Sequence, residues 1–108
     1  MLQAKRVGPP KVEPVTMGSA RYEVIHWGRK RNLGQNGGFI AAVNAKSGAE
    51  LWILKVYDIK YEEKLETDVQ DIFIKTMAKS KTKNTLDITD ERGRKFKVDV
   101  ETRKVTAE

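Results

Sequence analysis

The segment DIKYEEKLETDVQDIFIKTMAK, residues 58–79, decides the fold class that the sequence predicts. Its apolar side chains recur at intervals of three and four residues, the spacing that brings side chains to one face of an α-helix. The members of this stripe are Tyr61, Leu65, Val69, Ile72, Phe73, Thr76 and Met77. Asp58 is a suitable N-cap residue for such a helix. We therefore expect one long helix from Asp58 to about Lys79, with Ile74 off the buried stripe.

Strands are predicted on both sides of this helix by β-branched, aromatic and alternating apolar residues. The predicted strands are Arg21–Trp27, Gly38–Ala45 and Glu50–Tyr57 before the helix, and Thr85–Thr89 and Lys95–Glu101 after it. Gly48 and Gly93 fit the positive-φ positions of hairpin turns. In the last hairpin, apolar and polar residues alternate so regularly that one face must be buried and the other solvated. A short further strand around Val105 can follow.

The predicted strand Glu50–Tyr57 is apolar on both faces, with Trp52 and Leu54 opposite Leu51 and Ile53. A strand with this pattern is usually central in its sheet. The second face of the sheet then needs a cover, which the arm, a loop or another subunit can supply.

Together these elements predict an α+β fold. We expect a two-layer sandwich in which an antiparallel sheet of about five strands packs on one long helix, in the order βββ-α-ββ. Residues 1–18 contain all three prolines and no apolar periodicity, so an extended or disordered arm is predicted there. Residues 19–108 are expected to form a single α+β domain, because 108 residues is the size of one domain.

Composition and charge narrow the class of protein without specifying a function. Apolar residues make up 39% of the chain and charged residues 33%, with no cysteine, which excludes disulfides and thiolate metal sites. No apolar run approaches the roughly 18 residues that cross a bilayer. A cytoplasmic protein without membrane contact is the default expectation. The formal net charge of +6 is uneven, since residues 1–55 hold nine basic and three acidic residues and Lys75–Lys83 adds four basic ones.

Two short segments resemble hairpins of known families. AVNAKSGAELW, residues 42–52, resembles the repeat motif of pyrroloquinoline-quinone-type β-propellers through its amide residue, turn glycine and following tryptophan. KVDVETRKV, residues 97–105, resembles the closing hairpin of PepSY-type domains. The shared feature is a strand, a turn and a strand, and a propeller needs several four-stranded blades. The resemblance therefore implies a β-hairpin at each place and carries over no cofactor and no binding residue.

No catalytic constellation is found, so the protein is expected not to be an enzyme and to need no cofactor. His26 is the only histidine, which together with the absence of cysteine excludes multi-histidine and thiolate zinc sites. The segment GQNGG, residues 34–38, lacks the lysine and the helix of a phosphate-binding loop. The acidic residues of the predicted helix are interpreted as a solvated face. They are Glu62, Glu63, Glu66, Asp68 and Asp71.

The segment from His26 to Gly38 is the most promising binding site. It places an imidazole and an indole before three consecutive basic residues and a loop rich in asparagine and glycine. Basic side chains can contact phosphates, an indole can stack on a base, and glycines let backbone amides approach an anion. The predicted binding residues are His26, Trp27, Arg29, Lys30, Arg31 and Asn36. The alternative is a mobile, solvated loop whose charge aids solubility.

Three hypotheses about function remain open. The first is a non-enzymatic binding domain whose basic loop contacts an anionic partner, with nucleic acid as the leading candidate. The second is a structural domain that forms a homodimer or a larger complex, which Ile53 and the off-stripe Ile74 motivate. The third is an enzyme or ligand binder with a pocket near His26 and Trp27. One basic face that merges residues 29–31 with residues 75–83 would favour nucleic acid, whereas basic groups on opposite sides would favour assembly.

Overall fold

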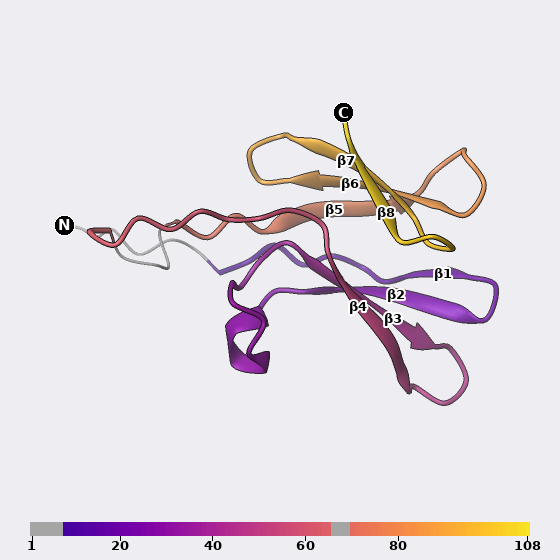
Figure 1. Cartoon of the computed structure of the whole chain (residues 1–108). Coiled ribbons are helices and arrows are strands. Elements are labelled where there is room, and N and C mark those ends of the chain that lie inside the picture. Colours follow the sequence, from indigo (N-terminus) through magenta and orange to yellow (C-terminus); the bar gives the residue numbers. More distant parts are fainter. Residues whose placement is uncertain (1–7, 66–69) are drawn as a thin grey trace.

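The computed structural model describes residues 8–65 and 70–108, and within them nearly all regular structure is β. Figure 1 shows two four-stranded antiparallel sheets, each a meander in chain order. The first sheet contains β1 (Val15–Met17), β2 (Ala20–Ile25), β3 (Phe39–Asn44) and β4 (Glu50–Lys55). The second contains β5 (Ile74–Lys79), β6 (Thr85–Asp90), β7 (Lys95–Asp99) and β8 (Lys104–Ala107). A single turn of 3₁₀ helix, η1 (Gly28–Arg31), lies between β2 and β3.

The predicted α+β fold with one long helix is therefore wrong. The described part of residues 58–79 holds no helical segment of that kind: residues 58–65 have no regular structure, and Ile74–Lys79 form strand β5. Residues 66–69, which include Val69 of the predicted stripe and two of its acidic residues, lie outside the described residues. Leu65 is 53% exposed, whereas Ile74, which the helix would leave off its stripe, is fully buried.

An irregularity in β5 explains why its sequence imitates a helix. The pairing of β5 with β6 shifts between Ile74 and Thr76, so the strand carries an extra residue there. Because of this bulge, Ile74 and Met77 are both buried although they are three residues apart, a spacing that a regular strand would place on opposite faces. The apparent helical period in residues 72–77 is therefore a β-bulge.

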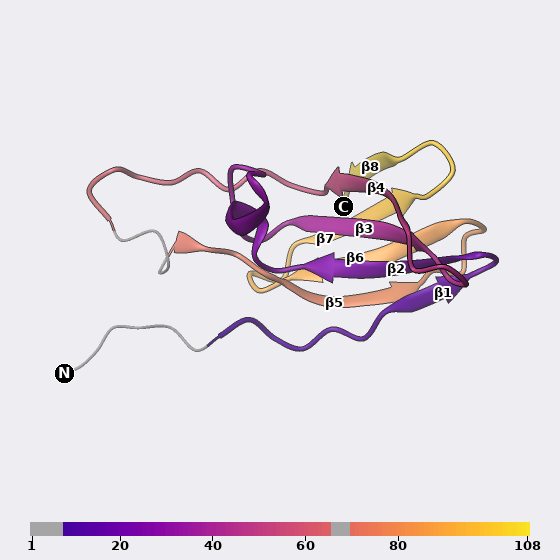
Figure 2. The same cartoon turned by 90° about the horizontal axis from the view of Figure 1, so that it is seen from below.

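Alternation in the second sheet agrees with the sequence. Leu86 pairs with Val98 and Ile88 with Phe96, and all four side chains are buried. These apolar residues face the first sheet and join its inward-facing side chains, such as Ile40 and Tyr22, in one core cluster. Figure 2 shows the two sheets overlapping, and β1 lies beside β5 where they meet. The molecule is thus a β-sandwich with its core between the two sheets.

The first sheet corrects the predicted position of one strand. β4 is the edge strand and not a central one, because the strand order is β1-β2-β3-β4. β3 is the strand buried on both faces, with Ile40 toward the core and Phe39, Ala41 and Val43 on the other side, none of them more than 5% exposed. The segment after β2 covers Phe39, since a Cβ on Gly28 would lie 2.8 Å from the phenyl ring. A loop therefore supplies part of the cover that the sequence required.

The two segments that resemble known hairpins form equivalent turns in the two sheets. Between β3 and β4, the Asn44 side chain accepts hydrogen bonds from the amides of Lys46 and Ser47, at 2.9 and 3.0 Å. Between β7 and β8, the Asp99 side chain accepts them from the second and third residues after it, at 2.9 and 3.1 Å. Gly48 and Arg103 then take positive φ, at 78° and 62°. Both hairpins are confirmed, and each closes a four-stranded meander.

Candidate binding site

Residues 26–38, here called the Trp27 loop, form a closed structure between β2 and β3. The amide of Gly28 donates to the carbonyl of Asn36 at 3.0 Å, and the amide of Leu33 donates to the carbonyl of Gly28 at 2.9 Å. Inside this ring lies η1, which ends at Asn32 in the left-handed conformation. The sequence indicated a loop here and gave no sign of this 3₁₀ turn, on which the basic residues lie.

Two glycines let the Trp27 loop pack against its surroundings. A Cβ on Gly28 would lie 2.2 Å from the carbonyl oxygen of Gln35, and a Cβ on Gly37 would lie 2.3 Å from that of Ile72. No side chain fits at either distance, so the glycines here serve close backbone packing. This packing does not depend on an anion, although the sequence had suggested that the glycines let backbone amides approach one.

Gln35 fixes the Trp27 loop to the segment after β4. Its side chain is buried, and its amide nitrogen donates to the carbonyls of Gly37 at 2.9 Å and Tyr57 at 2.8 Å. Its amide oxygen accepts a hydrogen bond from the backbone of Ile59 at 2.9 Å. Sequence reasoning missed this residue, because a glutamine in a stretch rich in glycine and asparagine carries no signal of burial.

Asn36, a predicted binding residue, is a structural bridge. Its side-chain nitrogen donates to Asp71 at 2.9 Å, and its side-chain oxygen accepts a hydrogen bond from the amide of Arg29 at 3.2 Å. The hydroxyl of Tyr61 donates to the same Asp71 at 2.5 Å. Burial, and then the hydrogen bond to Asp71, raise the pKa of Tyr61 to about 12, so the phenol remains a donor. Asn36 thus ties η1 to the segment that leads into β5.

His26 and Trp27 both pack edge-on against Phe73, with ring centroids 5.5 and 5.7 Å away. Phe73 is buried, whereas Trp27 remains 45% exposed. Burial lowers the pKa of His26, although a hydrogen bond with the backbone of Pro10 and the charge of Glu91 oppose the shift. The Nδ1 atom of His26 is buried without a hydrogen-bond partner among the described residues. The imidazole is therefore part of the packing, and the indole is the exposed ring.

The three basic residues of η1 have different surroundings. The guanidinium of Arg29 lies 4.6 Å from the ring centroid of Tyr61, and the ammonium of Lys30 lies 5.6 Å from that of Trp27. Arg31 instead reaches across to β4, where its Nη2 atom lies 2.6 and 2.8 Å from the two carboxylate oxygens of Glu50. Glu50 balances the charge of Arg31, so Arg29 and Lys30 carry the positive charge beside the exposed indole.

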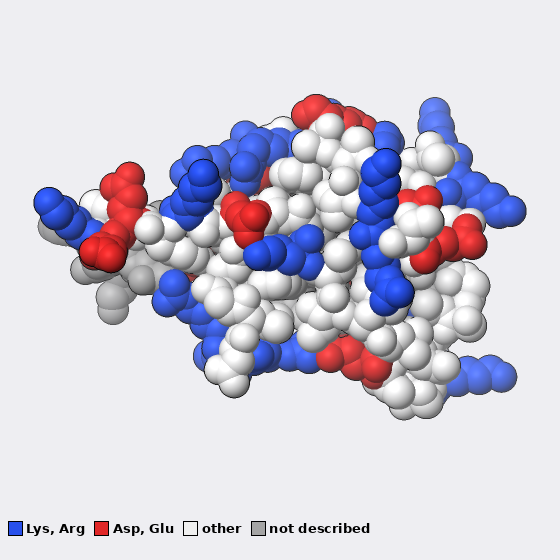
Figure 3. All heavy atoms as spheres, viewed as in Figure 1, with Lys and Arg blue, Asp and Glu red and all other residues white. Residues whose placement is uncertain are grey.

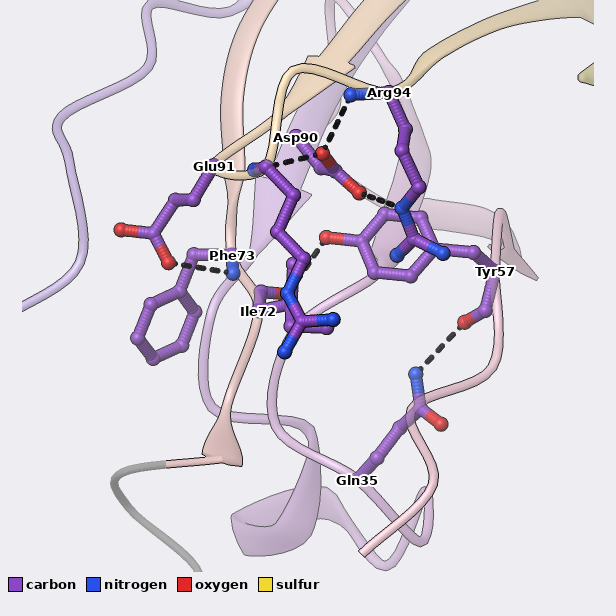
Figure 4. A network of polar contacts seen from close by, with 8 residues as sticks. Gln35, Tyr57, Ile72, Phe73, Asp90, Glu91 and Arg94 are labelled. Carbon is purple, nitrogen blue, oxygen red and sulfur yellow. Dashed lines mark hydrogen bonds and ion pairs between the residues drawn. The ribbon is translucent and has the colours of Figure 1, made fainter.

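A polar network under the loop joins the two sheets (Figure 4). The hydroxyl of Tyr57 donates to the carbonyl of Ile72 at 2.6 Å, and its ring stacks on Phe96 at a centroid distance of 5.2 Å. Burial raises the pKa of Tyr57, which keeps the hydroxyl protonated as a donor. The backbone amide of Phe73 donates to Glu91 at 2.9 Å. This network holds the segment that places Phe73 beneath the indole.

Asp90 is the fully buried acid of that network. Its carboxylate accepts hydrogen bonds from the amides of Arg92 and Arg94, each at 2.9 Å, and lies 2.6 Å from Nε of Arg94. The sequence contained a signal for this residue, because Asp90 follows Leu86 and Ile88 at a spacing of two and so falls on the buried face. A buried carboxylate needs such partners to offset its desolvation.

The basic groups do not merge into one face. Figures 1 and 2 show η1 at one end of the sandwich and the turn between β5 and β6 at the other. On the face in Figure 3, basic side chains are interspersed with acidic ones. Basic groups at opposite ends of the molecule favour assembly over a broad nucleic-acid surface. Any contact of η1 with an anion must therefore be a local one.

The described residues hold no group of three or more histidine, cysteine, aspartate or glutamate side chains placed to bind a metal ion. In the same residues, no helix has the length and apolarity needed to cross a membrane. No protein-family model matches the chain, and no curated protein is significantly similar to it. The geometry of the Trp27 loop is therefore the basis for inferring a function.

Proposed function

We propose that this protein is a non-enzymatic binding domain, and that its Trp27 loop contacts a short stretch of single-stranded nucleic acid. The observation that carries the proposal is the pairing of a 45% exposed indole with an ammonium group 5.6 Å from its centroid, both on a closed loop. An exposed aromatic ring offers a stacking surface to any base, and neighbouring cations attract the phosphates.

The rigidity of the loop supports this role. Gln35 and Asn36 hold the loop through hydrogen bonds to two other segments, the one after β4 and the one before β5, so little ordering would accompany binding. Phe73 supports the indole from below. A preformed stacking surface spends less of its interaction energy on conformational entropy than a mobile loop does.

The predicted binding residues separate into two groups in this proposal. Trp27, Arg29 and Lys30 make the contacts, with the indole on a base and the two cations on phosphates. His26 and Asn36 position them, and Arg31 holds η1 to β4 through Glu50. The small number of free cations limits the electrostatic part of the affinity to about two phosphates.

The proposal is tested by measuring the affinity for fluorescent oligothymidylate as a function of salt. Replacing Trp27 by alanine is expected to weaken binding by about 1–3 kcal/mol, the usual contribution of one stacked base. Two phosphate contacts predict a slope of log K against log salt near −1.4, at about −0.7 per phosphate for a single strand. The double variant Arg29→Ala/Lys30→Ala is expected to flatten that slope.

A matched control is Lys46→Ala/Lys95→Ala, which removes the same charge at two other exposed sites. It is expected to leave the affinity within about twofold of the parent, since distant exposed charges are screened. Absence of binding at low salt would overturn the proposal. So would equal losses in the control and in the Arg29/Lys30 variant.

A second candidate function is assembly through β4, and one observation favours it. β4 is a sheet edge, and Leu51 on it is 53% exposed, which leaves an apolar strand edge available to a second chain. Ile74, which together with Ile53 suggested assembly in the sequence, is buried in the core and no longer supports it. Sedimentation at micromolar concentration distinguishes the candidates. A dimer that Leu51→Lys dissociates supports assembly, and a monomer at all concentrations excludes it.

A further inference from the structure

A cleft lies at the end of the sandwich opposite the Trp27 loop. Its volume is about 430 Å³, and it opens between the β1–β2 turn and the β5–β6 turn. Its lining includes the apolar or aromatic residues Met17, Tyr22 and Val100 and the exposed lysines Lys79, Lys81 and Lys83. This volume is in the range of pockets that take small molecules, about 300–1,000 Å³.

All the charged residues that line this cleft are basic. Three lysines line it, and none of its lining residues is acidic. Each of the three is exposed and forms no ion pair with a described residue. Lys97 differs, because its ammonium lies 2.7 Å from Asp87. Among the described residues, Glu101 contacts the lining, because it accepts a hydrogen bond from the side chain of Asn84. The lysine charges of the cleft are therefore available to an anion.

Hydrogen bonds hold the turn that carries these lysines in one conformation. The amide of Ser80 donates to the carbonyl of Thr85 at 2.9 Å, and the amide of Thr82 donates to the hydroxyl of Ser80 at 3.1 Å. Asn84, in the left-handed conformation, accepts a backbone hydrogen bond from Val100 at 2.9 Å. Lys79, Lys81 and Lys83 thus project from a backbone that these hydrogen bonds hold in place. The bond from Val100 also links the β5–β6 turn to the β7–β8 turn.

A neutral donor completes the lining. Tyr22 lines the cleft from β2, and its hydroxyl makes no hydrogen bond to any described residue. Burial raises the pKa of Tyr22, which keeps the hydroxyl protonated. A phosphate oxygen in the cleft would satisfy this donor while the lysines offset its charge.

We propose that this cleft binds a small oligophosphate, with its phosphate groups on Lys79, Lys81 and Lys83. Three ammonium groups match an anion of about three charges, which is the chemistry of a linear triphosphate and not of one carboxylate. The site is independent of the Trp27 loop, since the two lie at opposite ends of the sandwich. Free tripolyphosphate and the triphosphate of a nucleotide share this chemistry, and direct comparison separates them.

The test is calorimetric titration of the full chain with tripolyphosphate, with a nucleoside triphosphate and with inorganic phosphate. Tripolyphosphate is expected to bind at least tenfold tighter than phosphate, and Lys81→Ala/Lys83→Ala is expected to lose at least tenfold of that affinity. Equal affinities for tripolyphosphate and nucleotide would identify the phosphates as the whole ligand. Tighter nucleotide binding would also support the site and would assign part of the affinity to the nucleoside.

The control Lys46→Ala/Lys95→Ala removes the same charge outside the cleft and is expected to bind tripolyphosphate like the parent. Amide chemical shifts give a second readout, with the largest changes expected at residues 79–84 and at Val100. Equal losses in the two double variants would overturn the proposal, because they would mean attraction by net charge alone. Shift changes spread over lysines throughout the chain would overturn it as well.

Discussion

At the scale of single residues, buried polar side chains determine which exposed residues can meet a partner. Gln35 and Asn36 have the composition of a solvated loop, yet each makes hydrogen bonds to distant parts of the chain. Arg31 belongs to the basic cluster in sequence but to the Glu50 ion pair in space. Trp27 and Lys30 are left as the exposed pair. The chemistry of the loop follows from these partners more than from its composition.

Removal of the Tyr57 hydroxyl is expected to weaken the link between the sheets. Tyr57→Phe leaves the buried carbonyl of Ile72 without its partner at 2.6 Å and should lower the free energy of unfolding by about 1–2 kcal/mol. Tyr22→Phe is the matched control, because the Tyr22 hydroxyl makes no hydrogen bond to any described residue and its loss should cost less. Urea denaturation of both variants measures the difference. A larger loss for Tyr22→Phe would contradict the role given to Tyr57.

His26 is expected to make the stability depend on pH. Its pKa in the folded protein lies below the ordinary value of 6.5 because of burial, so the unfolded chain binds more protons. The contribution is fully present above that value and is lost as the pH falls through the lowered pKa. Unfolding midpoints at about pH 7.5 and about pH 5.5 measure it. The fall in stability should be smaller in His26→Gln than in the parent, and an equal fall would contradict the assignment.

At the scale of elements, the structure differs most from the sequence-based prediction in residues 58–79, which were expected to form a helix. A helix would bury Leu65 and leave Ile74 at the edge of its buried stripe. In the structure, Ile74 on β5 is completely buried, and Leu65, which precedes the strand, is 53% exposed. The cause is the bulge, which gives β5 the three-residue spacing of a helix. Tertiary pairing with β6 therefore decides the conformation of residues whose local pattern is ambiguous.

Truncation of these two side chains distinguishes the two folds. Ile74→Ala is expected to lower the free energy of unfolding by about 2–4 kcal/mol, and Leu65→Ala by no more than about 0.5 kcal/mol. Ile74→Val, at about 1 kcal/mol, serves if the alanine variant does not fold. Chemical denaturation gives all three values. The opposite order, with the larger loss at Leu65, would support the helix.

Hairpins were predictable from the sequence, and the packing of the strands was not. Period-two alternation and turn glycines locate the strands on either side of Gly48 and Gly93, because those signals are local. The position of β4 at an edge depends on what covers the neighbouring strand, and no local pattern records that. The same limit applies to the candidate site. Trp27 could be predicted as a binding residue from its neighbours in the sequence, whereas the burial of Gln35 depends on contacts with the distant residue Tyr57.

At the scale of the whole molecule, two successive meanders pack face to face and leave different chemistry at their two ends (Figure 1). One end holds the exposed indole of Trp27 with its neighbouring cations, and the other holds the lysine cleft. The edge strand β4 runs along the side, with Leu51 exposed. The molecule therefore presents three separate surfaces. Substitutions can abolish the proposed binding at one of them without changing the residues of the other two.

The most direct test of the central claim is a titration of the isotope-labelled protein with oligothymidylate at low salt, followed by amide and indole chemical shifts. The account predicts that the largest changes occur at the Trp27 indole and within residues 26–38. The indole of Trp52, which packs between Tyr22 and Arg103, should stay unchanged as an internal control. Unchanged shifts at Trp27, or larger changes at residues 79–84 than in the Trp27 loop, would contradict it.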